Sequence, residues 1–373
     1  MTTPAPSPAA PQATVKTFPC KSCGARLSFA PGTKTLKCEF CGAANDIPKS
    51  DDQIEELDFE VYLKALADKQ EHYEQVHMKC TNCGAEQTLA PNMFAGICSF
   101  CATPIVAQGY ANRLVKPKSL IPFRIAKDKA QDEFRKWIRG LWLAPSELKK
   151  YAQGDGGLNG MYVPYWTYDC HTHSDYEGER GTEYSESYTT RNSAGETVTQ
   201  TRTRVDWTAV SGSVNNTFDD VLVPASPTLS SVAGGFFASR FSAWNTKALV
   251  PYSEEFITGF QAEAYQLGLS DGYRTAKQII DGRIEQSIRQ DIGGDQQRIS
   301  SVSTQYSNIT FKHVLMPVWI SAYRYRDKVY RFMVNGQNGE VKGESPKSGW
   351  KIFFLVLGIL AVLFIVLMLG GKR

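Results

Sequence analysis

The pattern of hydrophobic and polar positions divides this chain of 373 residues into three parts. Residues 119–345 alternate between stretches of period two and stretches of period near 3.6, which predicts strands and helices within one domain. The helix predicted over 126–140 places four apolar side chains on one face: Ala130, Phe134, Trp137 and Ile138. A second helix is predicted over 270–292, and Gly293 is a typical glycine stop at its C-terminal end.

The strand pattern of residues 119–345 is typical of hairpins. Residues 157–178 alternate bulky and polar side chains, and a threonine-rich hairpin turns between Asn192 and Gly195. Together these patterns predict an α+β domain with a mainly antiparallel sheet. Val163–Asp169 and Met316–Tyr323 share an apolar residue, proline, tryptophan and tyrosine, which predicts an internal duplication of the domain.

The last part of the chain is apolar throughout. Ile352–Leu369 has no charged residue, which predicts a transmembrane helix over 350–371, the alternative being a buried core helix. Three lysines precede the span and Lys372 and Arg373 follow it, a slight bias toward a cytoplasmic N-terminal side. We therefore expect one C-terminal anchor with the other domains in the cytoplasm. Residues 1–15 hold four prolines and predict a disordered lead rather than a signal peptide.

Eight of the nine cysteines form two equal units. Within each unit two Cys-x-x-Cys pairs are separated by fourteen residues, and the units repeat at an offset of 60 residues. The first unit predicts a zinc ribbon over 16–50 and the second a zinc ribbon over 79–108. The predicted metal ligands are Cys20, Cys23, Cys38, Cys41, Cys80, Cys83, Cys98 and Cys101.

Four thiolates complete a tetrahedral zinc shell and leave no open position for a substrate, so two structural zinc ions are expected. Disulfides or redox-active pairs are the alternatives, and a reducing cytoplasm disfavours them. A glycine follows the second cysteine of three pairs, at Gly24, Gly42 and Gly84, where a positive φ is often required. Ala102 departs from that pattern.

The net charge of +3 results from basic and acidic segments that largely cancel each other. Residues 16–50 hold six basic and two acidic side chains, whereas residues 51–79 hold three basic and nine acidic ones. The acidic stretch 51–78 predicts an amphipathic helical linker, whose apolar positions are Ile54, Leu57, Val61 and Leu66. This balance favours protein partners over nucleic acid, which remains possible through the basic first ribbon.

Candidate catalytic residues are few. His171 and His173 lie on a predicted strand and face opposite to Cys170, so these three side chains do not converge. The carboxylate pairs Asp219-Asp220 and Asp291 with Asp295 fit ordinary turn and helix-end positions. The chain contains neither a GxxxxGK[ST] phosphate loop nor a GxGxxG sequence. The sequence therefore favours a protein that is not an enzyme.

Several motifs together resemble a bacterial family with two N-terminal zinc ribbons and a C-terminal membrane anchor. They are the CxxCGA knuckles, WIRGLWLAPSEL, GMYVPYWTYD, FDDVLVPAS, DIGGDQQRI, the stretch from Thr310 to Pro346 and the apolar tail. Members of this family often carry the names primosomal protein N′, superfamily II helicase or transcription-factor-IIB-type zinc ribbon protein. The resemblance implies partners among SPFH-domain proteins and phage-shock protein A-like proteins at the inner membrane.

Three functions follow as expectations. The first is a membrane-anchored adaptor that recruits cytoplasmic proteins, possibly in envelope stress or membrane organisation. The second is a nucleic-acid-binding accessory protein of replication or transcription, motivated by Lys21, Arg26, Lys34 and Lys37 of the first ribbon. The third is an enzyme with a site around His171, His173 and Asp295, and it has the least support.

Overall fold

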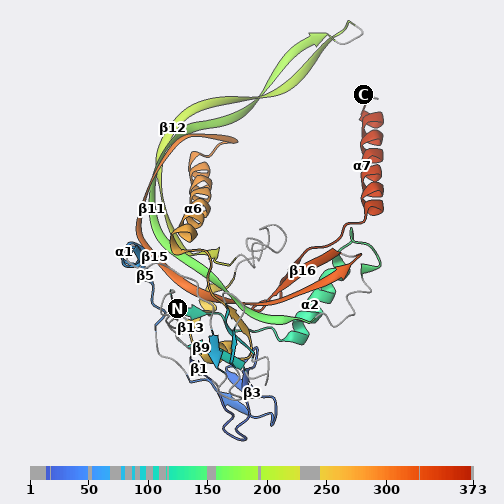
Figure 1. The fold of residues 1–373 in the computed structure, drawn as a ribbon. Helices are drawn as coiled ribbons and strands as arrows, with labels where there is room; N and C mark the ends of the chain where they lie inside the picture. The colour runs from blue at the N-terminus through green and yellow to red at the C-terminus, as the bar shows by residue number, and fades with distance from the viewer. Residues whose placement is uncertain are drawn as a thin grey trace, which may run out of the picture.

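Three very long antiparallel strands dominate the fold (Figure 1). A computed structural model of the chain describes residues 14–16, 18–48, 53–67, 77–79, 86–88, 93–97, 104–108, 115, 117–148, 157–191, 195–226, 244–326 and 328–370. Its strands are mostly antiparallel and occur together with α-helices, three of which (59–67, 127–140 and 269–292) pack on the large sheet, so the expected α+β class is confirmed. The predicted lead, residues 1–15, lies almost entirely outside the described residues.

The described strands form three sheets. The largest has twelve strands, and the path through eight of them runs β1-β9-β8-β14-β11-β15-β10-β13, with β5, β12, β16 and β17 off that path. These strands are β1 Thr14–Lys16, β5 Leu57–Asp58, β8 Met93–Ile97, β9 Pro104–Gln108, β10 Ser119–Leu120, β11 Asn159–Arg191, β12 Thr197–Pro224, β13 Val250–Pro251, β14 Gln261–Glu263, β15 Gln296–Tyr325, β16 Lys328–Asn335 and β17 Val341–Gly343. The two small sheets hold β2 Leu27–Phe29, β3 Thr35–Cys38 and β4 Ala44–Asp46, and β6 His77–Lys79 with β7 Glu86–Thr88.

Six helices lie among the described residues. They are α1 Phe59–Ala67, α2 Lys127–Gly140, the 3₁₀ helix η2 Thr246–Ala248, α5 Glu254–Ile257, α6 Leu269–Ile292 and α7 Gly349–Gly370. The two helices expected inside the domain are confirmed as α2 and α6. Gly293 ends α6 with a φ of 66°, as its glycine predicts.

Strand β11 lies at the centre of the large sheet. It pairs with β12 on one side from Tyr165 onward and with β15 on the other side from Asn159 to Gly181. The predicted hairpin is confirmed, but its arms are longer than the sequence pattern suggests because residues 159–191 form one continuous strand. The two similar proline-containing segments lie in neighbouring strands, and Pro164 of β11 is opposite Leu315 of β15.

Helix α6 covers one face of the three long strands (Figure 1). The buried residues of α6 recur at every fourth position and form a stripe along the helix. Four residues rotate a helix by about 400°, about 40° more than a full turn, so the stripe winds gradually around the axis of α6. A winding stripe follows the right-handed twist of the strands beneath it. The buried stripe consists of Gly272, Ala276, Ile280, Ile284, Ile288 and Ile292.

Among the described strands, only β11 and β12 pair with each other at the far end of their hairpin. Strand β15 begins at Gln296, opposite Gly181, so residues 182–191 and 197–206 form a two-stranded ribbon that we call the free arm. The free arm leaves the body on the same side as α7 (Figure 1). One face of it carries only hydroxyl side chains at three cross-strand pairs: Ser185 with Thr203, Ser187 with Thr201, and Thr189 with Thr199.

The acidic linker differs from its sequence prediction. The described helix is α1, beginning at Phe59, and Leu57 belongs to strand β5, where it pairs with Phe311 of β15. Val61 was expected on the apolar stripe but is 66% exposed. The buried anchor is instead Phe59, whose ring meets Tyr168, Tyr273 and Phe311. Aromatic residues of the large sheet therefore determine which face of the linker is buried.

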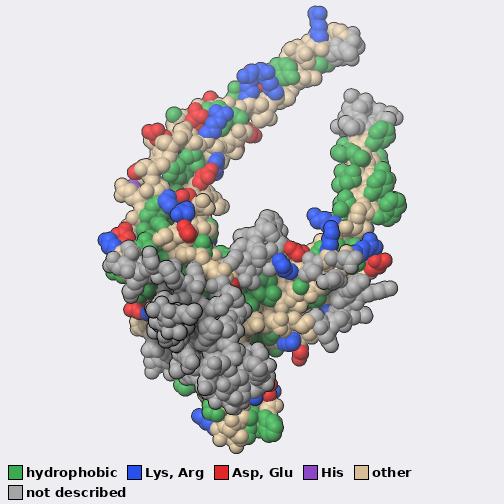
Figure 2. All heavy atoms as spheres, in the orientation of Figure 1, with side chains coloured by type: hydrophobic (Ala, Val, Ile, Leu, Met, Phe, Trp, Pro, Cys, Tyr) green, Lys and Arg blue, Asp and Glu red, His purple; other side chains and the backbone are tan. Residues whose placement is uncertain are grey.

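The expected C-terminal apolar helix is confirmed as α7. It is long and apolar enough to cross a membrane, the one described helix that meets this test, and it is not buried against the body. Every side chain from Phe353 to Val366 is exposed. Figure 2 shows the contrast between α7, covered with hydrophobic side chains, and the free arm, which carries charged ones.

The contact between α6 and β11 generates a stability prediction. A Cβ atom at Gly272 would lie 2.5 Å from the Tyr168 hydroxyl and 2.8 Å from Trp166, whereas a Cβ at Gly282 meets nothing within 4 Å. Both aromatic side chains are held by hydrogen bonds to carbonyls, Trp166 to Leu267 and Tyr168 to Leu269. Gly272→Ala should therefore lower the free energy of unfolding by about 1–3 kcal/mol, the usual cost of overpacking.

Gly282→Ala is the matched control and should raise the free energy of unfolding by up to about 1 kcal/mol, because alanine favours the helix. Urea unfolding of the full chain in mild detergent compares the two variants. An equal effect of both substitutions would contradict the close approach of α6 to β11.

Candidate metal centre

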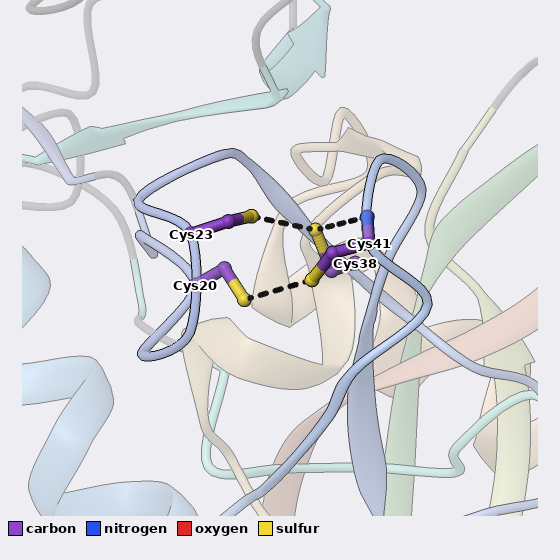
Figure 3. A group of neighbouring side chains, drawn as sticks. All are labelled: Cys20, Cys23, Cys38 and Cys41. Carbon is purple, nitrogen blue, oxygen red and sulfur yellow. Dashed lines mark hydrogen bonds between the residues drawn. The ribbon is translucent and has the colours of Figure 1, made fainter.

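The four cysteines of the first unit converge at one end of a small sheet. Strands β2, β3 and β4 pair antiparallel and carry two loops, each with a Cys-x-x-Cys pair. Figure 3 shows the side chains of Cys20, Cys23, Cys38 and Cys41 pointing toward one another from these loops. Their sulfur atoms all lie within 4.8 Å of one another, so the expected convergence of this unit is confirmed.

The distances fit a metal ion. The Cys20 and Cys41 sulfurs are 3.7 Å apart and the Cys23 and Cys38 sulfurs are 3.6 Å apart. A tetrahedron of four sulfurs, each about 2.3 Å from a zinc ion, has edges of about 3.8 Å. These four side chains could therefore hold a metal ion with little movement.

Backbone amides make the thiolate form of two cysteines easier to reach. The Ser22 N–H donates to the Cys20 sulfur at 3.4 Å, and this bond, followed by one from the Cys23 N–H, lowers the pKa of Cys20 to about 6. The Cys41 N–H donates to the Cys38 sulfur at 3.5 Å and lowers the pKa of Cys38. The glycines that follow the pairs permit these turns, since Gly24 has a φ of 72° and Gly42 a φ of 74°.

The opposite end of this unit is packed into the body. Phe29 lies with its ring 5.3 Å from that of Phe256, and its backbone N–H donates to the Thr258 carbonyl. The Gly32 N–H donates to the Phe123 carbonyl at 2.8 Å. The first cysteine unit is thus fixed to the large domain by its strands, and its cysteine loops face away from that domain.

An apolar side chain projects beside the cysteines. Phe40 lies between Cys38 and Cys41 and is 85% exposed. The basic side chains that the sequence singles out in this unit are all exposed: Lys21, Arg26, Lys34 and Lys37. The cysteine loops therefore present one exposed aromatic ring on a unit whose charged side chains are mostly basic, although the exposed Glu39 directly precedes Phe40.

The second cysteine unit is described only in part. Cys80, Cys83, Cys98 and Cys101 lie outside the described residues, as do Gly84 and Ala102. Strands β8 and β9 of this unit pair with each other, and β8 also pairs with β14 of the large sheet. The backbone of the second unit thus extends the large sheet, which the cysteine spacing does not predict.

A second group of charged residues forms where the long strands bend. Asp220 of β12 and Asn308 of β15 both have a φ of 51°, and the register of β11 shifts on either side of Asp169. Beside this bend the Lys312 ammonium lies 2.8 Å from Glu56, 2.9 Å from Asp220 and 3.6 Å from Asp169.

The Lys312 ammonium already supplies a positive charge to this group of carboxylates. The carboxylates of Asp169, Asp219 and Asp220 lie close enough to share a metal ion, but the buried Lys312 binds two of them directly. Glu56 belongs to the linker before α1, so this lysine also joins the linker to the sheet. Sequence reasoning missed Lys312 and Glu56 because 256 positions separate them.

The other candidate residues of the sequence do not form one site. Cys170 is buried, while His171 and His173 lie on the exposed face and bind Thr217 and Asn215, as the strand alternation predicts. Asp295 accepts a hydrogen bond from the Glu183 N–H. Asp291 accepts one from the Tyr176 hydroxyl at 2.5 Å. Each of these groups has a local partner in the strands.

These observations define the class: a mixed α+β protein with a four-cysteine cluster suited to a metal ion and one candidate membrane helix. Comparison with known proteins finds similarity to the uncharacterized protein YdjG of Bacillus subtilis (strain 168). The two chains are 25% identical over 374 aligned positions, which cover 95% of this chain and 98% of the relative. No protein-family model matches the chain, and no solved structure matches it.

The first cysteine unit generates a prediction about metal content. Cys38→Ser removes a buried member of the four-sulfur shell, so the purified full chain should contain one metal ion fewer than the wild type. Cys170→Ala is the matched control, because Cys170 is also buried but lies in β11 outside the cluster. Elemental analysis by mass spectrometry measures both, and an unchanged metal content in Cys38→Ser would contradict the assignment.

The Lys312 group generates a prediction about pH. Burial raises the pKa of Asp169 from 3.8 to about 6, outweighing the Asp220 N–H bond and the Lys312 charge. The folded chain therefore holds this proton more tightly than the unfolded chain. The resulting stabilisation is present below pH 3.8 and is lost as the pH rises through about 6.

Asp169→Asn removes that titration and keeps an oxygen for the Asp220 N–H. Relative to the wild type, its free energy of unfolding should rise by about 2–3 kcal/mol between pH 4 and pH 7. The exposed Asp175→Asn, on the same strand, controls for the loss of one negative charge. Urea unfolding across pH measures the difference, and a relative stability of Asp169→Asn that falls over this range contradicts the prediction.

Proposed function

We propose that this chain is a membrane-anchored adaptor that recruits cytoplasmic proteins to the inner membrane of a bacterium. The observation that carries the proposal is α7, whose apolar side chains are exposed from Phe353 to Val366 on an otherwise folded body. Exposed apolar area of this extent is unfavourable in water and favourable in a bilayer. The anchor is single-pass, and the N-terminal domains lie in the cytoplasm.

The metal ions have a structural role in this proposal. Each of the two cysteine units is a zinc ribbon that binds one zinc ion through four thiolates, so that the chain carries two zinc ions in all. Four-sulfur coordination leaves no open position, and the proposal assigns no reaction to the chain. Zinc stiffens the loops around Phe40, and a stiff loop loses little conformational entropy when a partner binds.

The cysteine loops of the first unit are the docking element. They lie at the end of the body remote from α7 (Figure 1). Phe40 is 85% exposed there, and a large apolar side chain on a rigid loop is the kind of residue that dominates protein interfaces. The excess of basic over acidic side chains in residues 16–50 favours an acidic partner surface. By the family resemblance, SPFH-domain and phage-shock protein A-like proteins are the partners to test first.

Nucleic-acid binding is the second candidate, and the same loops motivate it. The exposed Phe40 ring could stack on a base while exposed lysines of the same unit, such as Lys21 and Lys37, bind phosphates. Two thiolate-bound zinc ions add negative charge to the N-terminal region, which disfavours this alternative.

Affinity purification of the full chain from detergent-solubilised membranes tests the adaptor. Phe40→Ala should reduce a co-purifying SPFH-domain or phage-shock protein A-like protein by at least about tenfold, since an interface anchor typically contributes about 2 kcal/mol or more. Val61→Ala is the matched control, because Val61 is an exposed apolar residue on α1. Metal content should stay unchanged in both variants.

Equal recovery of the partner with Phe40→Ala and Val61→Ala would contradict docking through the cysteine loops. A gel-shift titration separates the second candidate: binding of single-stranded DNA that weakens with salt and with Phe40→Ala would support nucleic acid instead.

A further inference from the structure

Two exposed tryptophans lie at the base of α7. Trp350 is in its first turn and is 69% exposed, and its ring stacks on Phe353. Trp142 lies in the loop Leu141–Ala144, which we call the Trp142 loop, and is 63% exposed. Tryptophan combines a large apolar ring with one N–H donor, a chemistry that suits the headgroup layer of a bilayer better than water.

The Trp142 loop is bound to the start of α7. The Lys351 ammonium donates to the Trp142 carbonyl at 3.1 Å and to the Ala144 carbonyl at 2.7 Å. The Ser348 N–H donates to the Leu143 carbonyl at 2.8 Å. The side chain of Ala144 is buried in the domain core, so the loop is held firmly on its other side. Trp142 is thus positioned at the level where α7 leaves the body.

The surroundings of the loop fit an anionic lipid surface. Figure 2 shows Lys and Arg side chains gathered where α7 leaves the body. Lys347 is exposed and lies two residues before the start of α7. Basic side chains next to a membrane span are attracted to anionic headgroups.

The position of the free arm limits how the molecule can be oriented when α7 lies in a bilayer. The start of β15 lies level with α7, and the free arm reaches beyond it on the same side of the body (Figure 1). A bilayer whose normal follows α7 in this arrangement would enclose the free arm. The arm carries the ion pairs of Glu186 with Arg202 and Arg204, and no described strand pairs with either of its outer edges. Neither charged side chains nor open strand edges tolerate hydrocarbon.

We propose that the Trp142 loop is a second membrane contact that inserts Trp142 into the lipid headgroup layer, and that α7 turns about its first residues on insertion so that the free arm stays in water. This inference rests on the proposed membrane anchoring by α7. The turn takes place after Ser348, where Gly349 begins the helix, and every side chain from Phe353 to Val366 is exposed. Lys351 lies close to this pivot and keeps the Trp142 loop at the membrane surface.

Tryptophan quenching by brominated lipids tests this inference. The full chain is placed in nanodiscs of phosphatidylcholine and phosphatidylglycerol with acyl chains brominated near the headgroups, and in matched nanodiscs without bromine. The quenched emission is the difference between the two. The chain has seven tryptophans, so Trp350→Phe, Trp142→Phe and Trp207→Phe each isolate one contribution. Trp207 pairs with Gly181 and reports the base of the free arm.

We expect Trp350→Phe and Trp142→Phe each to lower the quenched emission and Trp207→Phe to leave it unchanged. An unchanged value for Trp350→Phe overturns the anchoring by α7 and the inference with it. A loss with Trp350→Phe but none with Trp142→Phe overturns the second contact and leaves the anchor intact. A loss with Trp207→Phe overturns the turn of α7, since the arm would then lie in the bilayer.

Discussion

The antiparallel pairing of β11 with β15 is the interaction on which the rest of the structure depends. It joins two segments more than a hundred residues apart, and several larger features are attached to one of these two strands. Helix α6 packs on their common face, and the linker pairs with β15 at Phe311. Strand β16 pairs antiparallel with the last part of β15. Where the pairing stops at Gly181, the β11–β12 hairpin continues alone as the free arm.

The candidate metal centre could be predicted from the sequence because its geometry is local. Two short loops and one small sheet bring Cys20, Cys23, Cys38 and Cys41 together, and spacing alone encodes that arrangement. Helices α2 and α6 were predictable for the same reason, since the apolar spacing along each segment marks its buried face. The exposed apolar helix α7 could be predicted from the composition of its segment alone.

Long-range contacts account for what the sequence could not predict. The burial of Phe59 rather than Val61 depends on aromatic partners from β11, β15 and α6, and no periodicity in the linker specifies them. The bond between Lys312 and Glu56 joins distant segments at a bend that the strand pattern does not show. The pairing of β8 with β14, which joins the second cysteine unit to the large sheet, is likewise a contact between segments far apart in the sequence.

The proposed adaptor separates its two contacts along the molecule, with α7 at one end and the cysteine loops of the first unit at the other (Figure 1). The most direct test of its central claim is alkaline carbonate extraction of bacterial membranes that carry the full chain or a chain ending at Ser348. The account predicts that the full chain stays in the membrane pellet and that the shortened chain is released. Release of the full chain by carbonate would contradict it.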